Sequence, residues 1–419
     1  MISLRPIVAA LVGALALAAV LPAQITAAGG GLPERYPGQP YVLTRTGAKP
    51  LSTSKTIPYW HGEFTDPTNG VTYGYNMVGA DPATETATVI PVDIIPLNLT
   101  FDSAPGYALN GSDVVARTLA SPIFQNNDYS ATSAVSGAAD AIGRIPVVAG
   151  GPLSAGNTNV QYLDAIMRSQ FNRVGTGYHV ILQPTVLPAV PVNIPTDQGL
   201  LLRNPVGVLW GLQADPRAFD GVLAKLHLDP THLWILLTDN VFLGSPIGVC
   251  CATGFHATGL VAGRGGAQGS AQGDQPLPTW IYSAYVRPGT YNPVFRPFWS
   301  DINTLSHEIA EWADDPFINN YVNPWAVSEA PEYGCTNVLE IGDPVFHLAF
   351  ALPGNSYDAG PMADGYWHPE DEVFLPWMAR QAPNTTSQLT QQPSAFGGRY
   401  SFMGDLNPYP DFHRPAPGC

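Results

Sequence analysis

The sequence predicts an α+β protein in which a twisted, mixed β-sheet backs one amphipathic helix at residues 301–315. Strand-like runs are mixed with helical periodicities, and the two do not alternate strictly along the chain. Glycine and proline each account for 42 of the 419 residues, so the chain should be rich in loops. Hydrophobic residues make up 45% of the chain, which supports a packed core and argues against disorder.

The first 28 residues are typical of an export signal. Arg5 supplies a positive charge, an apolar run follows at 7–21, and small residues at 26–28 provide a cleavage region. The apolar run is short for a membrane span. We therefore expect a secreted protein, extracellular or periplasmic, with no membrane partner after cleavage.

The rest of the chain predicts one large domain between two irregular ends. Residues 29–55 form a Gly/Pro-rich leader, residues 56–380 a single large α+β domain, and residues 381–419 a polar tail. The formal net charge of −15 argues against a nucleic-acid partner, because phosphate binding requires a basic surface.

Strand signals begin near residue 57. Runs at 59–64 and 71–79 flank the turn DPTNG and predict a hairpin. Residues 86–101 carry two prolines, so they predict a strand near a sheet edge or two short strands. Further strands are expected at 178–187, 233–243 and 280–286.

Helical periodicity predicts three further helices, at 112–124, 158–174 and 215–226. Residues 259–278 are rich in glycine, glutamine and serine and are too long for an ordinary connection. They predict either a lid or a disordered loop.

The helix at 301–315 has both a core-facing stripe and defined ends. Leu305, Ile309 and Trp312 recur at helical spacing. Ser300 or Asp301 can cap its start, and the proline after residue 315 ends it.

The same helix carries the pattern His-Glu-x-x-Glu. His307 and Glu311 are four residues apart, so their side chains lie one turn above the other. The pattern differs by one residue from the His-Glu-x-x-His of zinc hydrolases, in which the Glu after the first histidine is the general base. We therefore expect His307 and Glu311 to bind zinc and Glu308 to activate the metal-bound water.

A third ligand is expected from the acidic group in LEIGDP, from either Glu340 or Asp343. Oxygen ligands weaken the Lewis acidity of zinc and also admit Ca²⁺ or Mn²⁺. The expected substrate is a peptide, which an edge strand at 281–286 could receive by strand addition, or a cell-wall polymer.

Other interpretations of the acidic residues stay open. The helix can be a solvated acidic face. Glu370, Asp371 and Glu372 lie among aromatic residues and permit a glycosidase with paired carboxylates. Three histidines are possible extra ligands: His256, His347 and His368.

The four cysteines of an exported chain can form disulfides. Cys250 and Cys251 are adjacent and poorly placed to pair with each other, so we expect one of them to pair with Cys335. That bond would join the region before the helix to the loop that carries Glu340.

Two segments resemble known families. Residues 306–311, 315–316 and 340–343 resemble the S-H-E-hydrophobic-x-E…D-P…E-I-x-D pattern of a group of secreted bacterial proteins, which implies a zincin-like fold and hydrolysis. Cys250, Cys251 and the GFHA segment at 254–257 resemble the plant EXORDIUM/phosphate-induced proteins. The second resemblance implies a non-catalytic, cell-wall-associated binding protein, because the plant proteins lack the His-Glu-x-x-Glu pattern.

Overall fold

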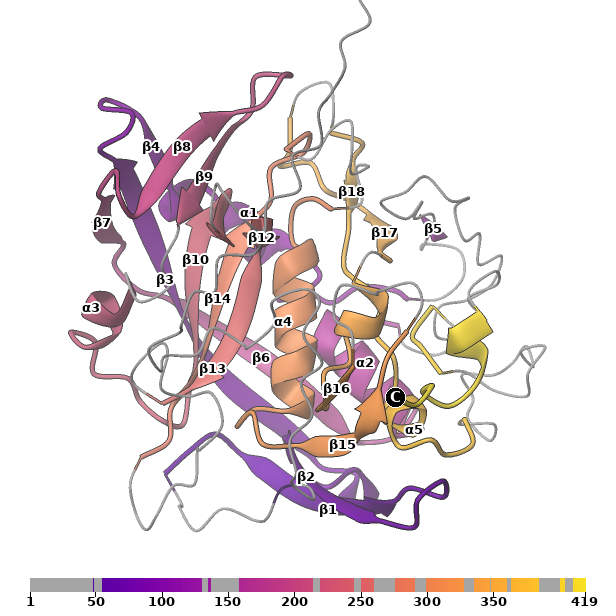
Figure 1. Cartoon of the computed structure of the whole chain (residues 1–419). Helices are drawn as coiled ribbons and strands as arrows, with labels where there is room; N and C mark the ends of the chain where they lie inside the picture. The colour runs from indigo at the N-terminus through magenta and orange to yellow at the C-terminus, as the bar shows by residue number, and fades with distance from the viewer. Residues whose placement is uncertain are drawn as a thin grey trace, which may run out of the picture.

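The fold in the computed structural model is α+β, with several sheets and few helices, as the sequence predicts (Figure 1). The described residues are 48, 55–129, 135–136, 158–213, 219–244, 250–259, 276–290, 299–327, 335–346, 348–359, 363–383, 400–403 and 410–419. The expected signal peptide, nearly all of the leader, most of the loop 259–278 and His347 lie outside them. The zincin-like character of the fold stays a prediction.

The largest sheet has the order β13-β14-β10-β3-β4, and β6 and β7 also pair with β3. It is mixed, because β10 runs parallel to β14 and β3 whereas β13 runs antiparallel to β14. Its strands are β3 (Ala87–Phe101), β4 (Ala108–Asn110), β6 (His179–Val186), β7 (Val190–Ile194), β10 (Leu233–Asp239), β13 (Gly254–Thr258) and β14 (Thr279–Tyr285).

Strand β3 is one long central strand, so the predicted edge position is wrong. Each proline of β3 is paired with a residue of one adjacent strand and lies where the pairing with the strand on the other side is interrupted. Pro91 faces β6 but precedes Val92, where the pairing with β10 begins. Pro96 faces β10 but lies between Ile94, the last residue paired with β6, and Leu97, the first paired with β7. A missing N–H is tolerated where a ladder is interrupted.

Strand β14 is internal as well, so the prediction of an edge strand at 281–286 is wrong. The short strand β13 adds to its outer side, and β10 pairs with its inner side. Its backbone groups are therefore already used in two ladders, and it cannot accept a peptide by strand addition.

The predicted hairpin is confirmed as β1 (Tyr59–Thr65) and β2 (Thr72–Val78). The expected strand at 233–243 divides into β10 and β11 at Asn240, whose φ is +57°. The remaining strands are β5 (Val135–Ser136), β8 (Gly199–Arg203), β9 (Leu209–Gln213), β11 (Val241–Gly244), β12 (Cys250–Ala252), β15 (Tyr321–Trp325), β16 (Thr336–Val338), β17 (Phe350–Pro353) and β18 (Tyr366–Trp367).

The expected helices are present but shorter than predicted. They are α1 (Val115–Ala120), α2 (Tyr162–Gln170), α3 (Asp220–Leu223) and α4 (Asn303–Asp314), followed by α5 (Leu375–Met378). None of the helices in the described part of the chain has the length and hydropathy that a membrane crossing requires.

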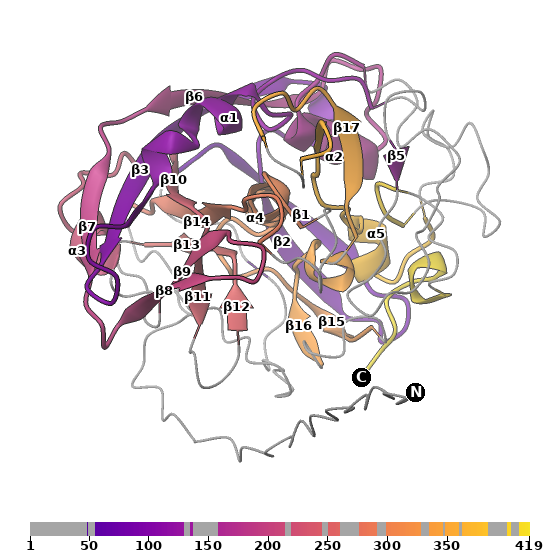
Figure 2. The same ribbon diagram turned by 90° about the horizontal axis from the view of Figure 1, so that it is seen from above.

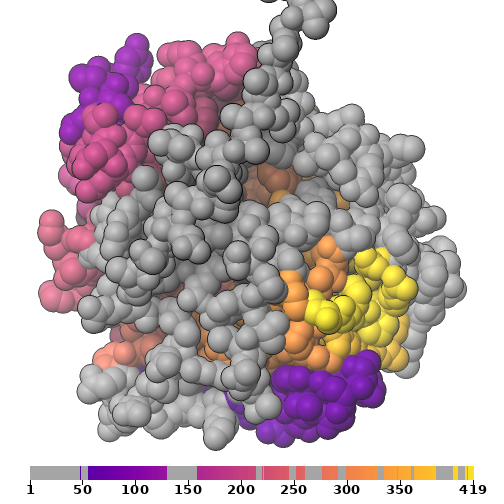
Figure 3. All heavy atoms as spheres, in the orientation of Figure 1, coloured from indigo at the N-terminus to yellow at the C-terminus, as the bar shows by residue number. Residues whose placement is uncertain are grey.

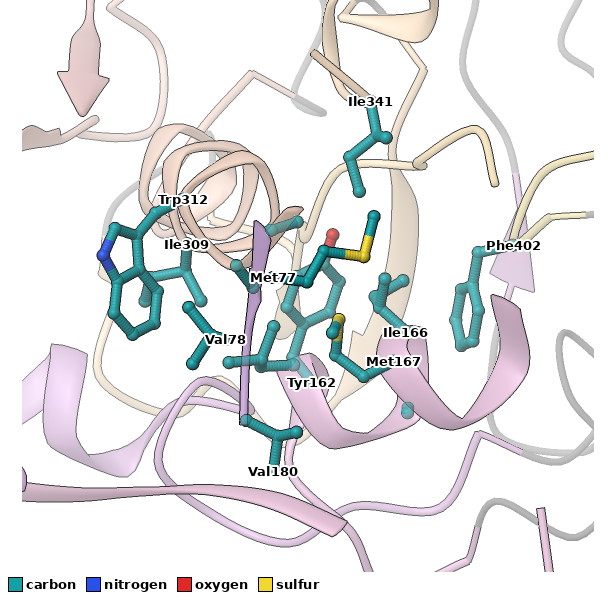
Figure 4. Packing of buried hydrophobic residues seen from close by; sticks show 14 of the residues in the cluster. Met77, Val78, Tyr162, Ile166, Met167, Val180, Ile309, Trp312, Ile341 and Phe402 are labelled. Carbon is teal, nitrogen blue, oxygen red and sulfur yellow. The ribbon is translucent and has the colours of Figure 1, made fainter. Parts of the chain in front are cut away.

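Helix α4 lies in the middle of the molecule, between the large sheet and the C-terminal segments that include β17 and α5 (Figure 2). Its apolar stripe packs into the main core as predicted. In Figure 4, Ile309 and Trp312 of α4 lie on one side of strand β2, and helix α2 lies on the other side. Val78 of β2 points toward Ile309 and Trp312. The polar side chains of α4 are almost all buried too, so it is not a solvated acidic face.

The start of α4 differs from the expected cap. Ile302 occupies the N-cap position, and no side chain caps the helix there. Asp301 adopts a positive φ of 48° and its Oδ2 lies 2.7 Å from Nδ1 of His368. The carboxylate thus holds a histidine from the C-terminal region. The helix ends at Asp314 with Asp315 as its C-cap, so the stop predicted at Asp315 and Pro316 is confirmed.

The C-terminal residues contribute to the core, although the sequence predicts a polar tail. Tyr400, Phe402, Met403 and Phe412 are buried in the main cluster. In Figure 3 the yellow C-terminal residues lie beside the indigo hairpin β1–β2. The aromatic residues are too sparse in this segment to give a periodic signal.

Cys335 pairs with Cys419, across a sequence separation of 84, so the predicted pairing of Cys335 with Cys250 or Cys251 is wrong. Strand β15 explains the partner, because Trp325 forms a bridge with Gly418 next to Cys419. The last residue of the sequence is thereby brought to the start of β16.

Cys335→Ser should lower the free energy of unfolding by about 2–5 kcal/mol, because the disulfide restricts a long loop in the unfolded chain. The check is a urea melt of the variant beside the wild type. Cys419→Ser should give the same loss, and unequal losses would contradict the pairing.

Asp314→Asn should change the pH dependence of stability. Burial raises the pKa of Asp314 to about 8. Stability from this group is fully present below pH 4, where the unfolded chain is also protonated, and is lost as the pH rises through 8. The variant should lose that slope, about 1.4 kcal/mol per pH unit, while Gln170 still donates to its side-chain oxygen.

Urea midpoints between pH 5 and pH 9 measure this effect. The exposed Asp197→Asn is the matched control and should leave the profile as in the wild type. Identical profiles for Asp314→Asn and the wild type would refute the role of Asp314.

Candidate metal centre

Helix α4 places three polar side chains of the predicted site. The Nε2 atom of His307 lies 3.2 Å from Oε2 of Glu311, one turn further along the helix. Glu308 and Glu311 are almost fully buried, and the His307 side chain is 13% exposed. The helix therefore points its acidic side into the protein, as a ligand-binding helix must.

The chain after α4 returns to the helix through β15 and β16. The backbone N–H of Leu339 donates to the carbonyl of Asn320, and four residues later the N–H of Asp343 donates to Oε1 of Glu311 at 3.2 Å. Oδ1 of Asp343 then lies 3.8 Å from Nε2 of His307. His307, Glu311 and Asp343 form a first group, whose ligand atoms all lie within 4.8 Å of one another.

The other nitrogen of His307 is held by a residue outside the predicted set. Nδ1 lies 2.8 Å from Oε1 of Glu370, and the backbone N–H of Glu370 donates to Oγ of Ser306. A histidine that donates Nδ1–H to a carboxylate can offer the lone pair of Nε2 to a cation. Metal-binding histidines commonly have such a carboxylate partner.

Glu372 lies on the same side of His307 as Glu370 does. Its Oε1 atom is 2.8 Å from the hydroxyl of Tyr162 in α2, and Oε2 has no hydrogen-bond partner among the described residues. Glu370, Asp371 and Glu372 are all buried. Of the three, Glu370 and Glu372 lie close to His307, whereas Oδ1 of Asp371 accepts the backbone N–H of Met403.

His256 enters the site from β13. It pairs with Ile281 of β14, so its side chain projects on the same face of the sheet as Ile281, which packs in the main core with α4. Its neighbour Phe255 projects on the opposite face, into a second cluster. The alternation of the strand therefore aims His256 at the helix.

A second group of ligands forms around His256. Its Nδ1 lies 3.5 Å from Oε2 of Glu308 and 3.8 Å from Oε2 of Glu311, and these three residues lie within ligand distance of one another. Oε2 of Glu340 is 3.9 Å from the other nitrogen, Nε2. Of the two predicted third ligands, Asp343 therefore joins the His307 group, while Glu340 lies beside His256.

Two glycines allow the backbone to approach these side chains. A Cβ atom on Gly254 would lie 2.6 Å from Cγ2 of Thr304 and 2.8 Å from Cγ of Glu308. A Cβ atom on Gly342 would lie 2.5 Å from Nδ1 of His307. Any larger residue would push the helix or its histidine away.

Burial and charge oppose each other at both histidines. Burial lowers the pKa of His256, but the carboxylates, Glu340 foremost, raise it to about 9. Burial likewise opposes the charges of Glu311 and Glu370 at His307, whose pKa is held well above its usual value. Burial also raises the pKa of Glu370, to about 8, against the charge of His307, which lowers it.

The donor atoms fit a divalent cation in both groups. Each group offers one imidazole nitrogen and two carboxylates, a set that suits Zn²⁺ or Mn²⁺ better than a purely soft or purely hard ion. The carboxylates outnumber the two histidines, and a cation would offset their mutual repulsion.

Sequence reasoning missed part of this site. By sequence, Glu370, Asp371 and Glu372 indicate only a glycosidase with paired carboxylates, and nothing in their spacing reveals the contact of Glu370 with His307, 63 residues earlier. The sequence likewise presents His256 only as a possible extra ligand. His368 contacts Asp301 and Asp364 and belongs to neither group.

Comparisons of the chain with protein-family models, curated proteins and solved structures gave no match. The resemblances to the secreted bacterial proteins and to the EXORDIUM proteins stay predictions.

Gly342→Ala should destabilise the protein by about 1–3 kcal/mol, because the added methyl group overlaps His307 Nδ1. Denaturant unfolding measures the loss. Gly221→Ala, in α3 with open space around it, is the control and should be neutral or slightly stabilising. Equal stability of the two variants would contradict the close approach at Gly342.

Proposed function

We propose that the protein is a secreted metal-dependent hydrolase, with peptides as its substrate class and Zn²⁺ as its cation. The observation that carries the proposal is the arrangement of His307. Its Nε2 atom faces Glu311 and Asp343, while its Nδ1 atom is held by Glu370. A carboxylate that fixes one nitrogen orients the other toward a metal.

The proposed roles follow from the positions of the side chains. His307, Glu311 and Asp343 would hold the cation, which when bound acts as a Lewis acid and makes a nearby water more acidic. Ser306 positions Glu370, and Glu370 positions His307. The partial exposure of His307 gives solvent a route to the group.

Glu308 is the proposed general base. Its carboxylate belongs to the same buried set as Glu311 and lies on the His256 side of it. A base there could take the proton of the attacking water, which is the role that a Glu directly after the first histidine has in zinc hydrolases.

A second candidate function is a non-catalytic binding protein in which the cation is structural. The burial of Glu308, Glu311 and His256 favours it, because a hydrolase needs access for a substrate. In that case the cation would raise the melting temperature without supporting turnover.

His307→Ala should remove the cation of the first group, because it deletes the only imidazole of that group. Elemental mass spectrometry of the purified protein measures the loss. His232→Ala is the matched control, since His232 also contacts a carboxylate, Asp93, at 2.7 Å but lies outside the site. Unchanged metal content in His307→Ala would refute the site.

Glu308→Gln should leave the cation of the His307 group bound and lower the rate of peptide hydrolysis by about 10²–10⁴-fold, because the amide cannot take a proton. A peptide library with mass-spectrometric detection provides the assay. Hydrolysis at the wild-type rate would exclude Glu308 as the base, and absence of hydrolysis by the metal-loaded wild type would favour the structural cation.

A further inference from the structure

The two candidate ligand groups share one side chain. Oε2 of Glu311 lies 3.2 Å from Nε2 of His307 and 3.8 Å from Nδ1 of His256. One carboxylate oxygen on α4 therefore faces an imidazole of its own helix and an imidazole of β13. A carboxylate between two histidines is well placed to bridge two cations.

His256 gives an independent sign that the second group takes a ligand. The residue is only 6% exposed, and its Nε2 atom has no hydrogen-bond partner among the described residues. Oε2 of Glu340 is 3.9 Å away, which is too far for a hydrogen bond. No hydrogen bond from the described part of the chain therefore fixes the buried ring at Nε2, and the ring can shift until Nδ1 binds a cation between Glu308 and Glu311.

The two histidines have the same relation to their surroundings. His307 turns Nε2 to the carboxylates of its group and Nδ1 to Glu370. His256 turns Nδ1 to Glu308 and Glu311 and the remaining nitrogen toward Glu340. In each case one nitrogen faces the carboxylates of its own group and the other faces a further carboxylate, at 2.8 Å in His307 and at 3.9 Å in His256.

Charge also favours a second cation. Glu308, Glu311 and Glu340 surround His256 in a buried position, where carboxylates repel one another strongly. A single imidazolium offsets only one of these charges. A divalent ion at the same place offsets two and accepts the lone pair of the histidine.

We infer that the protein holds a pair of divalent cations bridged by Glu311. The first binds to His307 and Asp343, and the second to His256 and Glu308. The inference rests on the proposed function for the first cation and adds the second. The mixed nitrogen and oxygen ligands suit Zn²⁺ or Mn²⁺ at both positions.

A paired centre changes the role of Glu308 and narrows the class of enzyme. Glu308 becomes a ligand of the second cation, so its replacement removes that ion together with the proposed base. Carboxylate-bridged pairs occur in aminopeptidases, phosphatases and nucleases, and they bind both the attacking and the leaving oxygen or nitrogen. Among these, a peptide substrate points to an aminopeptidase.

The test is the number of cations per chain in full-length protein loaded with Mn²⁺ and freed of excess metal. Elemental mass spectrometry should give two for the wild type and one for His256→Ala. Electron paramagnetic resonance should show exchange coupling between the ions in the wild type and an isolated Mn²⁺ signal in the variant. Glu311→Gln should abolish the coupling as well.

Glu308→Gln has almost the shape of the native residue and is the second variant if His256→Ala does not fold. It should also retain one cation. His232→Ala is the control and should retain two coupled ions. Circular dichroism confirms the fold of each variant before the metal is counted.

The outcomes separate the two proposals. One cation in the wild type, retained in His256→Ala and lost in His307→Ala, would overturn the pair and leave the proposed function standing. No bound cation would overturn both. Two cations without exchange coupling in the wild type would overturn the bridge by Glu311. Two cations that remain bound in both His256→Ala and Glu308→Gln would overturn the second site.

Discussion

The rest of the structure depends on the burial of the acidic side of α4. Glu308 and Glu311 project into the protein interior, where an uncompensated carboxylate is strongly unfavourable. Compensation comes from distant parts of the chain: His256 from β13, the backbone N–H of Asp343 from the segment after β16, and His307 from the helix itself. The helix can occupy the centre of the fold only because these groups converge on it.

The packing of the hydrophobic core also positions the buried acidic side of α4. Alternation along β14 sends Ile281 and Tyr285 to the side of α4 and sends Trp280 and Tyr282 into a second cluster. Trp312 of α4 packs on the first face and donates its indole N–H to Thr279. The sheet therefore positions the helix by apolar contact and aims His256 at it by the register of the neighbouring strand.

The C-terminal region contributes residues to the candidate metal centre. Glu370 holds His307 and Glu372 contacts Tyr162, while Phe402 donates its backbone N–H to the carbonyl of Glu372. The disulfide between Cys335 and Cys419 joins the end of this region to β16, which leads to Asp343. A hydrolase and a structural cation site would both benefit from such a rigid enclosure, and they differ in whether a substrate reaches His307.

The sequence by itself determined the local features. Helical spacing and the terminal proline located α4, the turn residues located the β1–β2 hairpin, and the i, i+4 spacing placed His307 beside Glu311, because these depend on neighbours along the chain. Only the tertiary structure decided what depends on distant contacts. It placed β3 and β14 inside the sheet, paired Cys335 with Cys419, and brought His256 and Glu370 to the helix. Strand order and long-range pairing are set by packing of the whole chain, and the local sequence carries no periodic signal for them.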